Sequence, residues 1–287
     1  MSDQGRRHEL LTTSAVLIAL STTTVVLRLT VRFFIVKKPG MDDYMMLGST
    51  LFNVGYLVCI VCIQADGLGF PMRTLTSENM RSFLKLSIVI EVIYYTIILF
   101  IKISIVFMYL RFAVSKTFRR FCYGTIAIQT LLFMASVTGT LRQCRPLEKV
   151  WDVPRLVSGT CINSTAFFYA ISSLNISTDI WILGLPIPTL RAIHICRREK
   201  YGLYCVFGIG IFATALSIVR LQSIYTYTLS IDPIHDGILI NLWSIIEINS
   251  AIVCANIPAL KILFTPRLLI EQTRTNNRST CFGSLEA

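Results

Sequence analysis

Seven long apolar blocks, separated by short polar segments, constrain the fold of this 287-residue chain more than any other feature. A helix needs about 20 mostly apolar residues to cross a bilayer, because each residue rises about 1.5 Å against a hydrocarbon core of about 30 Å. The blocks reach this length and take up nearly the whole chain, which leaves no room for a separate soluble domain. The sequence therefore predicts an all-α polytopic membrane protein, a bundle of seven transmembrane helices in contact with the lipid bilayer.

The predicted helices are bounded by polar and turn-forming residues. They cover 10–36, 43–64, 83–110, 121–141, a fifth segment that follows loop 142–162 and ends near Pro186 and Pro188, then 203–225 and 237–264. We expect three parts: an outer N-terminus of residues 1–9, a membrane domain of residues 10–264 and a short cytosolic tail of residues 265–287. The first block is longer than the apolar core of a signal peptide, which favours a retained helix over a cleaved leader.

The basic residues indicate how the chain is oriented. The net charge of +11 does not indicate nucleic-acid binding, because the Lys and Arg residues lie between the apolar blocks rather than on one face or tail. Sixteen of them fall in the first, third and fifth loops and the C-terminal tail, and nine in the other loops and the N-terminus. Because cytosolic segments carry the excess of Lys and Arg, the N-terminus is predicted outside and the C-terminus inside. We expect a multi-pass protein of the plasma membrane or an endomembrane.

Several short motifs occur in an order that points to one family. They are Asp42-Asp43, Gly67-Leu68-Gly69, the segment Lys102 to Arg111, Cys144-Arg-Pro146 with Trp151 and Cys161, the segment Asn175 to Pro188, Ser217-Ile-Val-Arg220, and Glu247 with Cys254-Ala-Asn-Ile-Pro258. Together they resemble the fungal rhodopsin-like integral membrane family, which includes satratoxin-cluster membrane proteins and Pth-type receptors. The chain departs from the family pattern at Phe70, where histidine is common, and in its short tail. The resemblance implies a seven-helix protein of fungal type, sometimes receptor-like and sometimes encoded beside secondary-metabolite genes.

Five ionisable residues fall well inside the predicted spans: Glu91, Lys102, Asp179, Arg220 and Glu247. A charge at mid-bilayer costs at least about 2.5–3.5 kcal/mol, so such side chains normally face the bundle interior and find partners. Their depths predict an outer cluster of Glu91, Arg220 and Glu247 and an inner pair of Lys102 with Asp179. Two interpretations stay open: a polar binding cavity with the inner pair as an activation latch, or buried pairs that only fix helix packing.

The fourth loop carries two candidate modifications. Cys144 and Cys161 share this predicted outer loop, where the oxidising compartment permits a disulfide. Closing a loop of this length stabilises by roughly 3 kcal/mol in the chain-entropy model. Asn163-Ser164-Thr165 is a glycosylation sequon on the same side, close to the start of the fifth predicted helix.

Catalytic and cofactor motifs are missing from the sequence. Only three histidines occur (His8, His194 and His235), and there is no Gly-x-Ser-x-Gly, phosphate-binding or dinucleotide-binding motif. A retinal Schiff base needs a lysine deep in the bundle. The last predicted helix has only Lys261, at its cytosolic end, and Lys102 is in the third helix. We therefore predict no enzyme activity, no metal site and no cofactor.

Three functions remain open from the sequence. The first is a receptor-like protein that senses an external small molecule and contacts a cytosolic signalling protein through its basic third and fifth loops. The second is a transporter, although no internal repeat of the kind common in transporters is evident. The third is an accessory membrane protein of a secondary-metabolite pathway.

Overall fold

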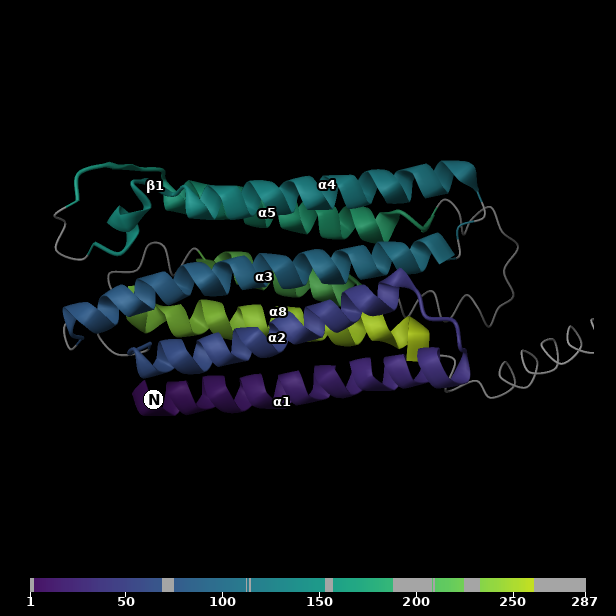
Figure 1. Ribbon diagram of the computed structural model, residues 1–287, viewed down its shortest axis with the longest axis horizontal. Helices are drawn as coiled ribbons and strands as arrows, with labels where there is room; N and C mark the ends of the chain where they lie inside the picture. The colour runs from purple at the N-terminus through teal and green to yellow at the C-terminus, as the bar shows by residue number, and fades with distance from the viewer. Residues whose placement is uncertain are drawn as a thin grey trace, which may run out of the picture.

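The computed structural model describes residues 3–68, 75–111, 113, 115–152, 157–187, 208, 210–224 and 233–260. Long helices lie side by side along one axis and form a bundle (Figure 1). They are α1 (Asp3–Thr30, continued by the π-helical turn η1, Val31–Ile35), α2 (Met41–Ala65), α3 (Ser77–Arg111), α4 (Lys116–Leu141), α5 (Ser164–Gly184) and α8 (Pro233–Leu260). Each of these six is long and apolar enough to cross a membrane, and a shorter apolar helix covers Gly210–Ile224. The helical membrane bundle predicted from the apolar blocks is thus confirmed.

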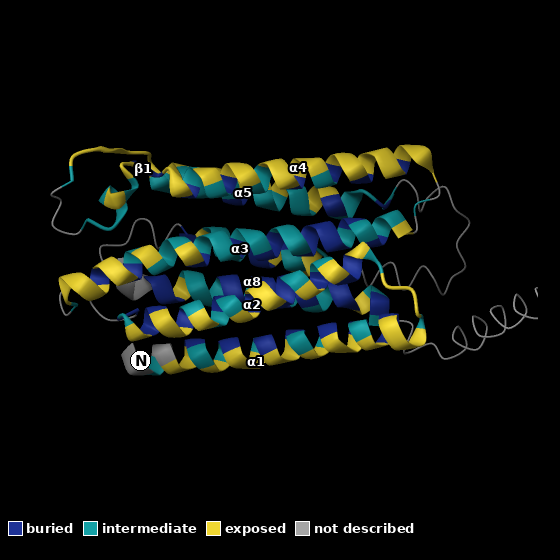
Figure 2. Cartoon of the chain, in the orientation of Figure 1, coloured by how far each residue is buried: buried dark blue, intermediate teal, exposed yellow. Residues whose placement is uncertain are grey.

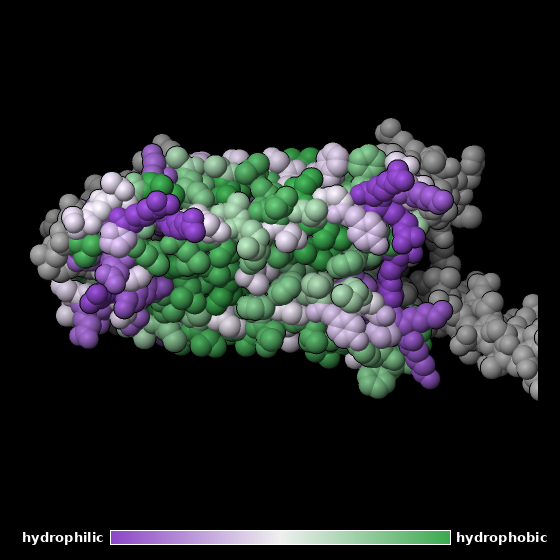
Figure 3. Space-filling model, turned by 45° about the horizontal axis from the view of Figure 1, so that its top comes forward, coloured by the Kyte–Doolittle hydropathy of each residue, from purple (hydrophilic) through white to green (hydrophobic). Residues whose placement is uncertain are grey.

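Apolar side chains face outward along the middle of the bundle. Figure 3 shows an apolar band with hydrophilic residues gathered at both ends, as expected for a surface in contact with lipid. Leu51 on α2 and Leu131 on α4 are 72% and 69% exposed. Such exposure of large apolar residues along whole helices is stable in lipid and not in water.

The helices α3 and α8 form the centre of the bundle. One buried apolar cluster joins α1, α2, α3 and α8, and a second, around Val106, Phe118, Cys122 and Ile182, joins α3, α4 and α5. Figure 2 shows α1 and α4 at the flanks with many exposed residues. Because α3 and α8 meet neighbours on several sides, polar residues on them can pair across the interior.

Several helices begin earlier than the apolar blocks predicted. The helix α3 starts at Ser77 instead of residue 83, and α4 starts at Lys116 instead of residue 121. The Ser115 side chain caps α4 by accepting a hydrogen bond from the Phe118 N–H, at 3.2 Å. Apolar blocks mark only the lipid-crossing part of a helix, so polar end turns are missed. The predicted loop after α5, the end of the last predicted helix and the tail lie outside the described residues.

A small hairpin lies at one end of the bundle, between α4 and α5 in the chain. Its strands β1 (Cys144–Arg145) and β2 (Thr160–Cys161) pair antiparallel, and the 3-10 turn η3 (Leu147–Val150) lies between them. A disulfide joins Cys144 to Cys161. The hairpin and the start of α1 lie at the same end (left in Figure 1), which is the predicted outer end.

Candidate functional site

Lys102 of α3 and Asp179 of α5 form a buried ion pair. The Lys102 Nζ lies 2.8 Å from the Asp179 Oδ1, and Lys102 is 5% exposed. The same Nζ donates to the Asn175 Oδ1 at 2.6 Å and to the Thr178 Oγ1 at 2.8 Å. Asn175, Thr178 and Asp179 fall on one face of α5 because they are three to four residues apart. This ammonium group is therefore fully partnered by a single neighbouring helix.

Arg220 and Glu247 form a second buried pair, closer to the hairpin end. The Arg220 Nε lies 3.5 Å from the Glu247 Oε2 and donates to the Ser244 Oγ at 3.0 Å. The guanidinium stacks on the Tyr94 ring, 3.8 Å from its centroid, and the Tyr94 hydroxyl donates to the Glu247 Oε2 at 2.8 Å. Three helices, α3, Gly210–Ile224 and α8, thus meet at this pair.

The two pairs are connected through one hydroxyl group. The Ser217 Oγ lies 2.7 Å from the Glu247 Oε1 and 3.3 Å from the Asp179 Oδ2. Depth along the helices predicts the pairs in separate layers, but depth gives no information on short polar bridges between them. In the structure they form one network, which we call the central network: Lys102, Asp179, Ser217, Glu247 and Arg220.

Glu91 lies apart from these pairs. Its Oε1 accepts hydrogen bonds from the Tyr95 hydroxyl at 2.7 Å and from the Thr140 hydroxyl of α4 at 3.0 Å. Within the described part of the chain its carboxylate has no cation within 4.0 Å, whereas Arg220 pairs with Glu247. The structure therefore does not join Glu91 to the other two residues of the expected outer cluster by an ion pair.

Glu91 and Arg220 nevertheless line the same cavity. Its volume is about 410 Å³, and its wall includes Tyr56, Tyr94 and Tyr95. Other lining residues, among them Gln143, Val150 and Ser164, come from the hairpin end of the bundle. A volume of this size is within the range that holds small molecules, and apolar and aromatic walls with a few polar groups are typical of such sites.

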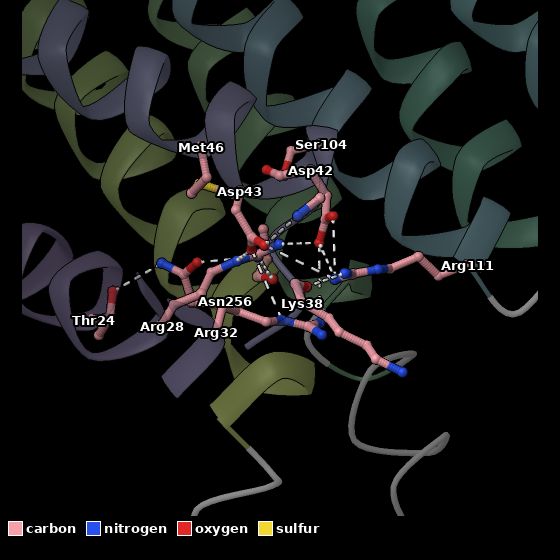
Figure 4. A network of polar contacts seen from close by, with 12 residues as sticks. Thr24, Arg28, Arg32, Lys38, Asp42, Asp43, Met46, Ser104, Arg111 and Asn256 are labelled. Atoms are coloured by element: carbon pink, nitrogen blue, oxygen red, sulfur yellow. Dashed lines mark hydrogen bonds and ion pairs between the residues drawn. The ribbon is translucent and has the colours of Figure 1, made fainter. Parts of the chain in front are cut away.

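A second polar network lies at the end of the bundle opposite the hairpin, and it was not predicted from the sequence. The Arg28 Nη2 lies 2.7 Å from the Asp42 Oδ2, and the Arg28 Nε lies 2.9 Å from the Asp43 Oδ1 (Figure 4). Arg111 approaches Asp42 at 3.3 Å, and Arg32 approaches both carboxylates at 3.9–4.0 Å. We call these five residues the arginine network.

Two sequence features could have revealed the arginine network. The adjacent Asp42 and Asp43 open α2, and Arg28 and Arg32 are four residues apart on one face of the first helix. In the sequence these arginines serve only as signals of membrane orientation. Their burial shows that a basic residue at the end of a span can also serve as a structural partner.

The described residues contain no cluster that could hold a metal ion. No group of three His, Cys, Asp or Glu side chains in this part of the chain is placed to hold a metal ion. The Asn163 sequon caps α5, with its Oδ1 accepting from the Ala166 N–H at 3.1 Å. Asn163 is exposed, and this contact uses its side-chain oxygen rather than its amide nitrogen.

Comparison with known families decides which family the chain belongs to. The fungal rhodopsin domain matches residues 27–266. The chain belongs to the fungal rhodopsin domain family. This confirms the resemblance inferred from the motifs, and no solved structure matches the chain.

Curated relatives of this fungal rhodopsin-domain protein have names that state differing roles. A SAT4 family membrane protein of Emericella nidulans is 27% identical over 87% of this chain and 62% of its own length. Receptor GIN3 of Arthrobotrys oligospora is 26% identical over 80% of this chain and 57% of its own length. Satratoxin biosynthesis SC1 cluster protein 4 of Stachybotrys chartarum is 26% identical over 55% of this chain and 57% of its own length. The chain thus spans about three fifths of the length of these relatives.

Proposed function

We propose that this fungal rhodopsin-domain protein is a receptor-like membrane protein that binds an external small molecule in the cavity beside Glu91 and Arg220. The observation that carries the proposal is the cavity of about 410 Å³ at the hairpin end, which is the predicted outer side. Arg220 lines this cavity and also belongs to the central network, where it pairs with Glu247. The relative named Receptor GIN3 supports the same class of function.

The walls of the cavity suggest the chemistry of the ligand. Both hydrogen bonds to Glu91 in the described structure end on Oε1, so its Oε2 has no such partner there. Both carboxylates of the central network pair with cations, whereas Glu91 has no ion-pair partner among the described residues. A largely apolar molecule that donates a hydrogen bond, from a hydroxyl or ammonium group, to Glu91 fits this site.

The helix α8 offers a path from the cavity to the opposite end. It carries Glu247 of the central network. Asn256 lies nine residues further, which is about 13.5 Å along the helix axis. The Asn256 Oδ1 accepts a hydrogen bond from Arg28 of the arginine network at 3.3 Å. A ligand that shifts Arg220 changes the pairing of Glu247 and thereby the position of α8. We propose that this movement changes the cytosolic third and fifth loops, where a signalling protein binds.

A binding assay with matched variants tests the proposal. Purified protein in lipid nanodiscs is screened against small apolar metabolites bearing hydroxyl or amine groups, and binding is measured by thermal shift and calorimetry. Glu91→Ala is expected to weaken binding on the order of 10–100-fold, since a hydrogen bond to a charged group contributes about 1.5–3 kcal/mol. Glu148→Ala, an exposed change in the hairpin, is the control and should bind normally. Equal affinity of Glu91→Ala and the parent chain would place the ligand elsewhere.

A second candidate is an accessory membrane protein or transporter of a secondary-metabolite pathway. It is favoured by relatives whose names are Satratoxin biosynthesis SC1 cluster protein 4 and Wortmanamides biosynthesis cluster protein C of Talaromyces wortmannii. Flux of the bound metabolite across reconstituted vesicles would support transport. Binding without flux would leave the receptor-like function as the better account.

A further inference from the structure

We propose that the arginine network binds the phosphate of an anionic phospholipid headgroup, with Arg32 as its main protein ligand. This site is separate from the cavity of the proposed function, so neither proposal depends on the other. Nothing in the family comparison assigns a ligand to this end of the bundle.

The side-chain donors of Arg32 make no hydrogen bond to any described residue. The residue is 7% exposed, yet its guanidinium forms no hydrogen bond within the described residues, and its Nε is fully buried without a partner. Its nearest acidic atoms are the Asp43 Oδ1 at 3.9 Å and the Asp42 Oδ2 at 4.0 Å, which is too far for hydrogen bonds. A guanidinium has five N–H donors and strongly favours planar or tetrahedral oxyanions. A buried guanidinium with free donors therefore points to an anionic ligand.

The carboxylates of the network are already occupied by other groups. Asp42 is bound by Arg28 at 2.7 Å and by Arg111 at 3.3 Å. Asp43 is bound by Arg28 at 2.9 Å and accepts from the Gly40 N–H at 3.0 Å. Three guanidinium groups thus face two carboxylates, and one positive charge in the network has no acidic partner among the described residues. The phosphate of a bound anionic phospholipid supplies the missing negative charge.

The neighbours of Arg32 favour a lipid over a free phosphate. Phe33, Phe34 and Ile35 follow it in η1 and are 41%, 75% and 44% exposed, at the end of a membrane span. Lys37 and Lys38 come next and are exposed. Figure 4 shows the Lys38 side chain extending away from the buried part of the network. Apolar side chains for the acyl chains and basic groups for the headgroup are therefore adjacent, which matches the chemistry of an anionic phospholipid at a membrane surface.

Lipid retention on the full chain tests this site. Protein is reconstituted in nanodiscs of phosphatidylcholine alone or with phosphatidic acid, and bound lipid is counted by native mass spectrometry after transfer to detergent. The parent chain is expected to retain phosphatidic acid at least tenfold over phosphatidylcholine, and to gain thermal stability from it. Arg32→Gln should lose both effects, while Arg119→Gln, an exposed change outside the network, should keep them.

Two outcomes would overturn the proposal. One is equal retention of phosphatidic acid by Arg32→Gln and the parent chain. The other is full stabilisation of the parent chain by inorganic phosphate without any preference for the lipid, which would indicate a free anion. Because the Arg32 side chain makes no hydrogen bond within the described residues, Arg32→Gln is expected to fold. If this variant does not fold, the proposal is still tested by whether the parent chain prefers phosphatidic acid to phosphatidylcholine and to inorganic phosphate.

Discussion

Removing the Lys102 ammonium should destabilise the bundle more than removing both charges of its pair. In Lys102→Met, the Asp179 carboxylate keeps, among the described residues, only the 3.3 Å contact to Ser217. A buried charge left without its partner costs about 3–5 kcal/mol. The Asp179 side chain is 22% exposed, so its charge is partly solvated and the lower end, about 3 kcal/mol, applies.

The double variant Lys102→Met/Asp179→Asn also removes the Asp179 charge that Lys102→Met leaves unpaired, and the new Asn side chain can still make polar contacts. We expect it to be more stable than Lys102→Met by about 1–2 kcal/mol, because breaking one partner of a buried pair costs more than replacing both. The double-mutant cycle isolates this coupling. At about 2–4 °C per kcal/mol, the single variant should lower the thermal midpoint on the order of 10 °C.

The assay is the fraction of folded protein that remains after heating in detergent, measured by fluorescence size-exclusion chromatography. Lys85→Met is the matched control, since Lys85 is an exposed lysine on the same helix. Its cation–π contact with Trp151, 5.5 Å from the ring centroid, is of a kind that contributes about 0.5–1 kcal/mol. A double variant that is no more stable than Lys102→Met would refute the reasoning, and so would a control as damaging as Lys102→Met.

Three further perturbations test other parts of the structure. Arg28→Met should cost about 3–5 kcal/mol of stability in the same assay, because Arg28 is 1% exposed and bonded to both aspartates, whereas Arg119→Met should cost little. Cys144→Ser/Cys161→Ser should lower stability by about 3 kcal/mol for a loop of 17 residues and abolish the effect of reductant on the midpoint; an unchanged response to reductant would contradict the disulfide. Asn163→Gln should abolish a mobility shift on endoglycosidase treatment, and a parent chain that shows no shift carries no glycan at this sequon.

The membrane bundle could be predicted from the sequence because lipid imposes one simple requirement. Only a long apolar helix satisfies its own backbone in the bilayer, so apolar blocks locate the spans directly. The ends of helices are set by capping and polar turns instead, which is why the start of α3 at Ser77 and of α4 at Lys116 was missed. The hydrophobic pattern carries no information on these turns.

The polar interior could be predicted only in part. Lys102 and Asp179 stand out because charges inside apolar blocks are rare, and they lie together in the structure. Arg28, Asp42 and Asp43 lie at the ends of blocks, where charges are common, so their spacing marks them as candidate partners but does not indicate that they are buried. The bridge at Ser217 depends on rotation of the helices about their axes, which a single sequence does not specify.

The central claim is a membrane bundle whose cavity end, with its disulfide hairpin, faces outward. The most direct measurement is labelling of introduced cysteines on intact cells with a membrane-impermeant maleimide, using the parent chain as background. Glu148→Cys in the hairpin should be labelled, and Lys116→Cys at the opposite end should be labelled only after permeabilisation; both positions are exposed. Labelling of Lys116→Cys on intact cells, with Glu148→Cys protected, would contradict the account.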